Sequence, residues 1–405
     1  MARPLYQPSD SAIPTRAHDG HAGLWYDKFC DQWNTAPWSM QAGGGDDRQA
    51  NPKLSWIDSL TRSELGDRSA LEESTTRLIR LSLQTHGISL VFRSDSRFVT
   101  GLGRSHPVEN GFAWHPTLGT PYLPGSSIKG MVHAWAKQEA AATKETDHQS
   151  VSEANQAKID RLFGKAGQSG SVSFLDAVPI APVSVEADVL TPHYAGWSPG
   201  DPPGDWRSPT PVPFLVTKEG LGLLFTLIPC PPTARPDQDQ RAADLQQLQQ
   251  DLELLKSWLI EALTWAGAGA KTAVGYGRFQ LLKEKSEELR QAELQRQQAK
   301  QQAQQEAERI ANLDPLDREL EELAAAEPTT NPPKPPYHAW IKAVVNDRWS
   351  EQPATARVVL IRIERAMREA GDWKEISQKK NPNKQSKNFL LTQKVKELIE
   401  RNRLG

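Results

Sequence analysis

Two short segments combine glycines with cations and hydroxyls, a combination that suits contact with a phosphate. In the first, "YLPGSSIKGMVHA" at residues 122–134, an apolar helical pattern begins directly after a proline. A helix N-terminus presents free N–H groups and a partial positive charge, and glycine lets a ligand approach the backbone. The segment therefore predicts an anion cradle made by Gly125, Ser126, Ser127, Lys129 and Gly130. Simple N-capping by one of the two serines is an equally good interpretation.

The second segment is "GAGAKTAVGYGRF" at residues 267–279, which follows a predicted helix and enters a predicted strand. Its glycines free the backbone for close approach, its cations neutralise phosphates and its tyrosine offers a stacking face. We therefore predict contacts to a nucleic-acid backbone from Gly267, Gly269, Lys271, Thr272, Tyr276 and Arg278. A glycine-rich turn packed against a sheet, with its lysine in solvent, is the alternative interpretation.

The adjacent Lys271 and Thr272 also invite comparison with the P-loop of nucleotide-binding proteins. The match fails because Ala270 occupies the position of the last glycine. The order helix, loop, strand is also the reverse of the order that aims backbone amides at a nucleotide. NTP hydrolysis is therefore not predicted.

Acid–base and metal chemistry have weaker support. The candidate groups are His106, His115, His133 and His193, with Glu109, Asp176 or Asp188 as partners. No H-x-x-x-H or H-E-x-x-H spacing occurs, so neither a metal site nor a cofactor is predicted. His–Asp ribonuclease chemistry needs proximity in space rather than in sequence. Asp188 and His193 therefore stay open as the groups of a metal-independent endoribonuclease.

Composition is that of a globular protein in a reducing compartment. The 405 residues carry a formal net charge of −2, so any basic surface must be local. Cys30 and Cys230 lie far apart and lack metal-ligand spacing. The start "MARPLYQPSD" has no apolar signal segment, and the longest apolar run, 221–228, is too short to span a bilayer. We expect a cytoplasmic protein.

The elements that must position the two segments follow an α+β pattern. Apolar and polar residues alternate closely enough over 77–92 to suggest a strand, although residues 78–83 also fit the start of a helix. Residues 171–180 indicate a strand, and 212–229 indicate a hairpin that turns at "KEG". An amphipathic helix at 237–265 precedes the final strand. This order is typical of a β-α-β-β-α-β ferredoxin-like fold with insertions.

Composition divides the chain into four parts. Residues 1–76 are rich in Trp, Pro and Gly and are expected to pack on a core or a partner surface, and 77–283 form the α+β domain. Residues 284–336 combine a Gln-rich helical stretch without an apolar stripe, expected to be solvated, with a Pro-rich linker. Residues 337–405 carry two helical patterns and predict a small basic domain, which is either an RNA-binding arm or a solvated charged face.

Several separated motifs together resemble a known family. "YLPGSSIKG" is similar to the signature of the RAMP superfamily of CRISPR-associated proteins, and "GAGAKTAVGYGRF" to its C-terminal glycine-rich loop. Within the superfamily, the sixth subunits of type III-B Cmr effector complexes resemble this chain in "HPVENGFAWHPTLGTPYLPGSSIKG", "FLDAVPI", "DVLTPHY" and "HAGLWYDKFCDQW". The likeness spans about residues 1–283.

The resemblance implies an RRM-like, ferredoxin-type RAMP fold, followed here by a helical C-terminal extension. It implies a non-catalytic subunit that holds the CRISPR RNA near its 3′ end, through the two glycine-bearing segments, in a ribonucleoprotein that captures complementary target RNA. The partners would be the CRISPR RNA, the target RNA and other Cmr subunits. Residues 190–206 would form a thumb-like insertion, and Asp188 just before it is the residue to test for cleavage. A protein-only assembly scaffold remains a second alternative to the RNA-binding role.

Overall fold

The computed structural model describes residues 16, 20–35, 38–40, 51–144, 149–191, 211–230, 238–327, 334–375 and 386–402. The chain forms two compact units, Met1–Gln295 (unit 1) and Arg296–Gly405 (unit 2). Among the residues that the structure describes, no helix has the length and apolar character needed to cross a membrane.

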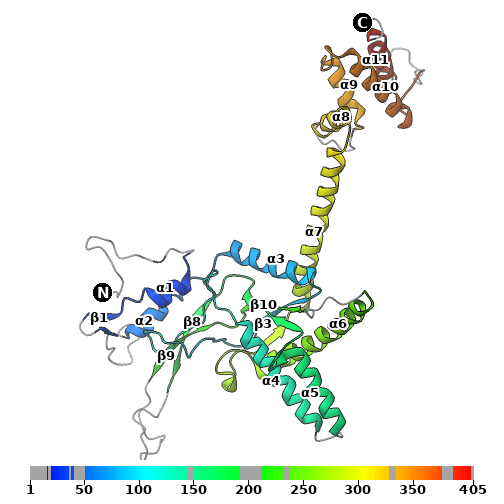
Figure 1. Ribbon diagram of the computed structural model, residues 1–405. Coiled ribbons are helices and arrows are strands. Elements are labelled where there is room, and N and C mark those ends of the chain that lie inside the picture. Colours follow the sequence, from blue (N-terminus) through cyan, green and yellow to red (C-terminus); the bar gives the residue numbers. More distant parts are fainter. Residues whose placement is uncertain are drawn as a thin grey trace, which may run out of the picture. The chain divides into compact units, whose positions relative to one another are not determined.

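An antiparallel sheet lies at the centre of unit 1 (Figure 1). Its strand order is β11 (Phe279–Leu281), β3 (Ile88–Ser94), β10 (Gly222–Pro229) and β6 (Val172–Phe174), and the short β7 (Val178–Pro179) also pairs with β10. Every pair is antiparallel. It follows that β3 runs parallel to β6 with β10 between them, and β10 runs parallel to β11 with β3 between them. The helices α4 (Gly125–Lys144) and α6 (Gln238–Glu261) lie in the connections of these two parallel pairs.

One face of the sheet is covered by α4 and α6. Successive side chains of a strand point to opposite faces, so alternate residues share a core. Phe92, Phe225 and Phe279, from three neighbouring strands, pack in one core with Ile128 of α4 and Leu259 of α6. This core holds the start of α4 and the end of α6 against the same sheet face.

The opposite face is covered by α3 (Arg68–Gln84) and by the start of α7 (Lys283–Ala311), where Val91 and Leu224 pack with Ile79 and Leu289. The predicted Gln-rich helix is confirmed as α7. Its first part is not solvated, however, because Glu293 is only 2% exposed and accepts a 2.6 Å bond from Arg80 Nε.

The predicted strand from residue 77 is wrong over its first half. Residues 77–84 are the end of α3, and the strand begins only at Ile88. The physical reason lies upstream, where the Asp67 carboxylate caps the helix by accepting a 2.8 Å bond from the Ala70 amide. Buried residues then recur at helical spacing at Leu71, Thr75 and Ile79.

The predicted hairpin at 212–229 is also wrong. Its two halves are strands, β9 (Val212–Thr217) and β10, but they belong to different sheets. β9 pairs with β8 (Val185–Leu190) in a two-stranded ribbon, and the strand expected at 171–180 is divided into β6 and β7. The chain changes sheets after Thr217, whose amide donates a 2.9 Å bond to the Phe98 carbonyl.

Two aromatic residues of the N-terminal segment pack into the core of unit 1. Tyr26 of α1 (Ala22–Lys28) and Trp56 of α2 (Pro52–Asp58) are buried in the same cluster as Phe92. The strands β1 (Trp33–Thr35) and β2 (Trp38–Met40) form a separate ribbon. Beyond α4, α5 (Gln149–Phe163) leads into the ribbon of β4 (Gly164–Lys165) and β5 (Gln168–Ser169).

Unit 2 is helical in its described residues. Besides the end of α7, it contains α8 (Pro315–Ala325), α9 (Tyr337–Val345), α10 (Pro353–Glu369) and α11 (Lys387–Arg401). They share a core that includes Leu320, Ile341, Ile363 and Val395. In the described residues after position 336 there are thus three helices, where the sequence suggested two. α8 lies within 284–336 and still contributes Leu320 to this core.

Candidate nucleic-acid interface

The glycine-rich loop 267–278 joins the end of α6 to β11. A π-helical turn, Ala262–Ala266, precedes it, and Thr272–Val274 form one 3₁₀ turn within it. All four of its glycines have positive φ, a region that favours glycine over residues with a Cβ. They are Gly267 at 78°, Gly269 at 86°, Gly275 at 95° and Gly277 at 69°.

Three of these glycines are required by the loop's own packing. A Cβ on Gly277 would lie 1.9 Å from the Ala268 carbonyl oxygen, and one on Gly269 would lie 2.3 Å from the Val99 carbonyl oxygen. A Cβ on Gly267 would lie 3.0 Å from the Gly277 carbonyl oxygen. These three glycines thus have a packing role, and their contact with a ligand stays a prediction. Only at Gly275 would a Cβ meet nothing within 4 Å.

Lys271 has an unusual conformation in this loop. Its φ of 60° places a non-glycine residue in the left-handed region, a strained arrangement that often marks functional sites. Its ammonium lies 5.3 Å from the ring centroid of Phe214 on β9 and 5.8 Å from that of Tyr276. Within the described part of the chain, Lys271 pairs with no carboxylate. Its charge therefore remains available for an anion.

Tyr276 ties the loop to the β8–β9 ribbon. Its hydroxyl donates a hydrogen bond to Asp188 of β8, whose carboxylate also pairs with Arg97 at 3.0 Å. Arg97 Nε in turn lies 2.5 Å from Glu186. Burial, reinforced by the Asp188 hydrogen bond, raises the pKa of Tyr276, and the hydrogen bond to Glu186 raises the pKa of Arg97. Asp188 thus has a structural role in this network, and His193, its predicted nuclease partner, lies outside the described residues.

The start of α4 is capped from within the chain. α4 begins at Gly125, and the Pro124 carbonyl accepts the amides of Ser127 (2.9 Å) and Ile128 (3.1 Å). Neither serine is therefore the N-cap. The Gly125 amide donates a 2.7 Å bond to the Asp176 carboxylate, and a Cβ on Gly125 would lie 2.1 Å from the Phe174 carbonyl oxygen. The sequence suggested that a phosphate would accept the Gly125 amide, but the Asp176 carboxylate accepts it instead.

A groove of about 350 Å³ lies between the start of α4 and the glycine-rich loop. Four of the predicted contact residues line it, namely Ser127, Gly267, Gly269 and Thr272. The 100–103 loop after β3 supplies the rest of one wall, which sequence reasoning had not assigned although its "TGLG" carries the same glycine signal. The structure thus brings the two predicted segments together along one groove.

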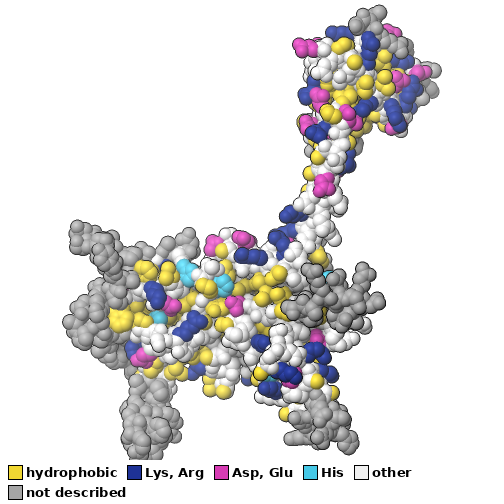
Figure 2. Space-filling view, in the orientation of Figure 1, with side chains coloured by type: hydrophobic (Ala, Val, Ile, Leu, Met, Phe, Trp, Pro, Cys, Tyr) yellow, Lys and Arg dark blue, Asp and Glu magenta, His cyan; other side chains and the backbone are white. Residues whose placement is uncertain are grey.

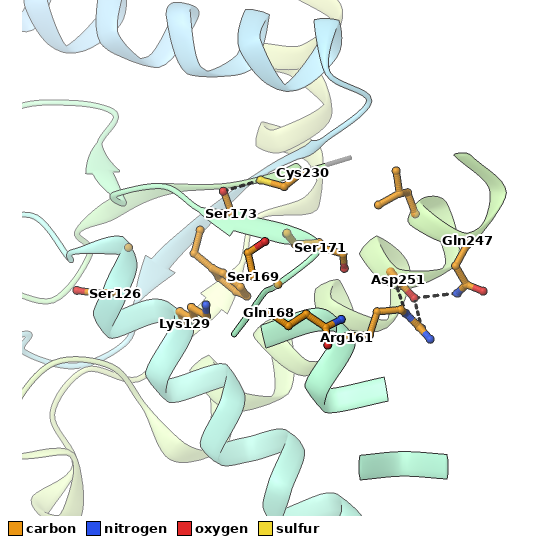
Figure 3. A pocket seen from close by; sticks show the side chains of 15 residues that line it. Ser126, Lys129, Arg161, Gln168, Ser169, Ser171, Ser173, Cys230, Gln247 and Asp251 are labelled. Atoms are coloured by element: carbon orange, nitrogen blue, oxygen red, sulfur yellow. Dashed lines mark hydrogen bonds and ion pairs between the residues drawn. The ribbon is translucent and has the colours of Figure 1, made fainter. Parts of the chain in front are cut away.

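The remaining predicted residues lie elsewhere. Gly125, Ser126 and Lys129 line a larger pocket of about 830 Å³, formed with α5, α6 and the β5–β6 region (Figure 3). Neither the groove nor this pocket is lined by Lys271, Tyr276, Arg278 or Gly130. A Cβ on Gly130 would meet nothing within 4 Å. The single predicted cradle is therefore divided between two concave sites that share the first turn of α4.

The three described histidines of the acid–base hypothesis have structural contacts. His106 Nδ1 accepts a 3.2 Å bond from the Val108 amide, its Nε2 donates to the Tyr26 carbonyl at 2.9 Å, and burial lowers its pKa to about 4. Burial also lowers the pKa of His115, whose Nδ1 accepts the Leu118 amide at 3.3 Å. The same holds for His133, which stacks on Phe163.

These contacts do not assemble an acid–base site. Within the described residues, no hydrogen bond or ion pair joins the three rings to Glu109, Asp176 or Asp188. The described residues also contain no group of three or more His, Cys, Asp or Glu side chains arranged to hold a metal ion.

The charge available for an anion is local. On the face seen in Figure 2, the basic side chains of unit 1 are interspersed with acidic and apolar ones. This distribution agrees with the formal net charge of −2. On this face, an anionic partner would depend on individual cations rather than on a uniformly basic surface.

Comparisons with known proteins agree with the motif resemblance. The model of the RAMP superfamily matches residues 91–280, which include the second half of β3, together with α4, β10 and the glycine-rich loop. The CRISPR system Cmr subunit Cmr6 of Pyrococcus furiosus is 27% identical over 250 residues, which cover 48% of this chain and 68% of that protein. The CRISPR system CMR subunit Cmr6 of Saccharolobus solfataricus is 31% identical over 88 residues, which cover 21% of this chain and 26% of that protein.

Solved structures show related similarities. The crystal structure of Cmr6 from Pyrococcus furiosus aligns with 48% of this chain and 98% of its own, at 25% identity and a TM-score of 0.31. A chain from the cryo-EM structure of the type III-B Cmr-beta bound to cognate target RNA aligns with 56% of this chain and 70% of its own, at 21% identity and a TM-score of 0.42. Residues 91–280 thus match the RAMP superfamily model, and the chain is similar to the Cmr6 subunits of CRISPR Cmr systems.

Proposed function

We propose that this chain is a non-catalytic RNA-binding subunit of a type III-B Cmr ribonucleoprotein complex, acting in antiviral defence in the cytoplasm. It holds the CRISPR RNA near its 3′ end and helps to capture complementary target RNA. The observation that carries the proposal is the groove in which Ser127 of α4 faces Gly267, Gly269 and Thr272 of the glycine-rich loop, inside a RAMP domain. Other Cmr subunits are the proposed protein partners.

The character of the groove supports a sugar-phosphate ligand. Its lining includes seven glycine, serine or threonine residues, namely Thr100, Gly101, Gly103, Ser127, Gly267, Gly269 and Thr272. Such a lining offers hydroxyls and backbone rather than base-reading side chains. A guide RNA needs no sequence reading by the protein, because base pairing with the target performs that reading. Backbone contact is therefore sufficient for the proposed role.

Charged and aromatic side chains of the glycine-rich loop and of the turn before it support the same ligand. Lys271 and Arg278 make no ion pair within the described part of the chain, so both cations can neutralise phosphates. Trp265, two residues before Gly267, is 68% exposed and offers a stacking face. A base stacked on an aromatic ring contributes about 1–3 kcal/mol to the binding of single strands.

The fold that we propose for the RAMP domain is ferredoxin-like, of the RRM type. The strand order of the central sheet supports it, because the pairs β3/β6 and β10/β11 are both split β-α-β units with an antiparallel strand inserted between their parallel strands. The division of the chain at residues 76, 283 and 336, with a helical extension after the RAMP domain, stays a prediction, as does the thumb-like role of residues 190–206.

A non-catalytic role is supported by the contacts of Asp188. This carboxylate pairs with Arg97 and accepts the Tyr276 hydroxyl, so its oxygens stabilise the junction between loop and ribbon. The endoribonuclease alternative predicts that the purified protein cleaves RNA in EDTA and that Asp188→Asn abolishes the cleavage. Under our proposal neither protein cleaves RNA. Cleavage by the parent protein that Asp188→Asn removes would establish the enzyme instead.

The RNA-binding role is tested by UV crosslinking with mass spectrometry on the complex purified through this chain. We expect RNA-linked peptides from residues 122–134 and 267–279. The double variant Lys271→Ala, Arg278→Ala should weaken RNA binding and lower the salt-dependence slope by about 0.7 for each lost phosphate contact. Lys285→Ala is the matched control, because Lys285 lies on α7 and pairs with Glu288 at 2.8 Å. It should leave both quantities unchanged.

RNA that copurifies without a crosslink in either segment would contradict the proposal. The groove would then be a structural junction, and the protein-only scaffold would be the better interpretation. Equal losses of affinity in the double variant and in Lys285→Ala would likewise show that the loop cations have no specific role.

A further inference from the structure

The larger of the two concave sites is distinct from the groove and has its own chemistry. It lies where the first turn of α4 meets the end of α5, the edge strand β6 and the helix α6 (Figure 3). Its volume is about 830 Å³, within the range of small-molecule and cofactor sites. Figure 3 shows Ser126 and Lys129 of α4 on one side, and Arg161 and Asp251 on the other.

The charges of this pocket leave one cation for a ligand. Asp251 is buried, with 3% side-chain exposure, and it is already satisfied: Arg161 donates two bonds to it at 2.6 and 3.0 Å, and Gln247 donates a third at 2.9 Å. Lys129 makes no hydrogen bond or ion pair within the described part of the chain. The lining therefore carries a net positive charge at Lys129, which suits a phosphate.

A buried hydroxyl in the same pocket also lacks a partner. Ser171 lines the pocket, and its Oγ is inaccessible and makes no hydrogen bond in the described structure. Leaving a buried polar group unsatisfied costs about 1–3 kcal/mol. Neighbouring Ser173 differs, because its Oγ lies 2.8 Å from Cys230 Sγ. To bond a ligand in the pocket, the Ser171 hydroxyl would have to turn toward it, because its oxygen is inaccessible in the described structure.

The first turn of α4 is a wall of both sites. Ser127 lines the groove, whereas the adjacent Ser126, together with Lys129, lines the pocket. An RNA strand that follows the groove therefore passes within one residue of the pocket. Phe174, also in the lining, supplies an apolar ring against which an unstacked base can pack. Among polar ligands of this size, a nucleotide fits the combination of one cation, hydroxyls and an aromatic face.

We propose that this pocket receives a single nucleotide of the bound RNA, turned out of the strand that occupies the groove. Lys129 pairs with its phosphate, and Ser171 hydrogen-bonds the sugar or base. The inference rests on the proposed RNA-binding function and adds to it a second site, separate from the groove. A free mononucleotide presents the same chemistry, so the test must distinguish the two sources.

The test uses the full chain in its complex, with guide RNAs that carry 4-thiouridine at successive positions. We expect one position, and only one, to crosslink to the peptide 168–174, while neighbouring positions crosslink to 267–279. Lys129→Ala should abolish the 168–174 crosslink and lower RNA affinity about tenfold, in line with one lost charge-assisted contact. The matched control is Lys137→Ala, an exposed lysine on the same helix, which should change neither.

Ser171→Ala separates a ligand contact from a structural one. Because the hydroxyl has no partner in the free chain, its removal should leave the melting temperature unchanged or raise it, while the 168–174 crosslink weakens. A lower melting temperature with an unchanged crosslink would overturn the proposal. UMP, added alone, should compete with the 168–174 crosslink only weakly. Full competition at micromolar UMP would assign the pocket to a free nucleotide and overturn the RNA assignment.

Failure of this inference and failure of the proposed function give different results. Crosslinks confined to 267–279 would remove the pocket from the RNA path and leave the groove proposal intact. RNA without crosslinks in either peptide would overturn both. Equal loss of affinity in Lys129→Ala and Lys137→Ala would reduce the role of Lys129 to general attraction and overturn the pocket proposal alone.

Discussion

At the scale of single residues, the pH response of unit 1 depends on His106. Its side chain is 2% exposed, and burial holds its pKa near 4 in the folded chain against 6.5 in the unfolded chain. The unfolded state therefore binds the proton first as pH falls, and the folded state loses stability between pH 6.5 and 4. Between pH 7 and 5 the loss should be about 2 kcal/mol. Hydrogen exchange of peptides from 51–140, at several pH values, measures it.

The control for this prediction is His106→Gln, which cannot titrate. The neighbouring ionisable groups, Asp27 with its carboxylate 3.9 Å from His106 Nε2 and Lys28 in the next position of α1, remain in that variant. The His106→Gln substitution should lower the stability of unit 1 at pH 7, because the stacking of the imidazole on Tyr26 is lost. Its stability should nevertheless fall less between pH 7 and 5. The same pH slope in both proteins would show that another group is responsible.

At the scale of elements, the glycines of the glycine-rich loop are predicted to differ in how strongly their replacement by alanine destabilises unit 1. Gly277→Ala would place a Cβ 1.9 Å from a backbone oxygen at a φ of 69°. We expect it to destabilise unit 1 by about 3 kcal/mol or more, because a backbone clash cannot relax by rotating a side chain. Gly275→Ala meets open space and should cost only about 1 kcal/mol for its positive φ. Thermal unfolding of the two variants compares them.

Similar losses in the two variants would contradict the packing role of Gly277. They would mean that the loop adjusts its backbone as a whole, and that its glycines are equivalent. The distinction separates packing from open space, because Gly275 is the loop glycine of the four at which an added Cβ meets nothing within 4 Å.

At the scale of the whole molecule, the two units are predicted to lose stability independently. Leu320 of α8 is 3% exposed in the core of unit 2. Leu320→Ala should destabilise unit 2 by about 2–5 kcal/mol through the cavity that it leaves. Leu390→Ala, at a position that is 50% exposed on α11, is the matched control and should change stability by less than about 0.5 kcal/mol.

Hydrogen exchange of the full chain distinguishes the units. In Leu320→Ala, peptides from 337–402 should lose protection while peptides from the central sheet of unit 1 keep it. Loss of protection in both units would show that they unfold together. That outcome would also mean that α8 is not simply part of a separate C-terminal domain.

The sequence by itself determined the features that depend on local pattern and composition. Helical periodicity located α6, and helix-forming composition located α7. The glycine spacing marked the two segments that line the groove, and motif resemblance pointed to the RAMP superfamily, whose model matches residues 91–280. Each of these depends on neighbouring residues along the chain, so no partner from a distant segment is needed to recognise it.

Only the tertiary structure decided which residues meet. Strand pairing separated β9 from β10, and the carboxylate of Asp176, 51 residues away, took the first amide of α4. The candidate site was likewise divided in two, because adjacent serines on one helical turn face different walls. Asp188 became part of an ion-pair network through Arg97, 91 residues away. Contacts between distant segments depend on how the chain packs in three dimensions, which local sequence patterns do not encode.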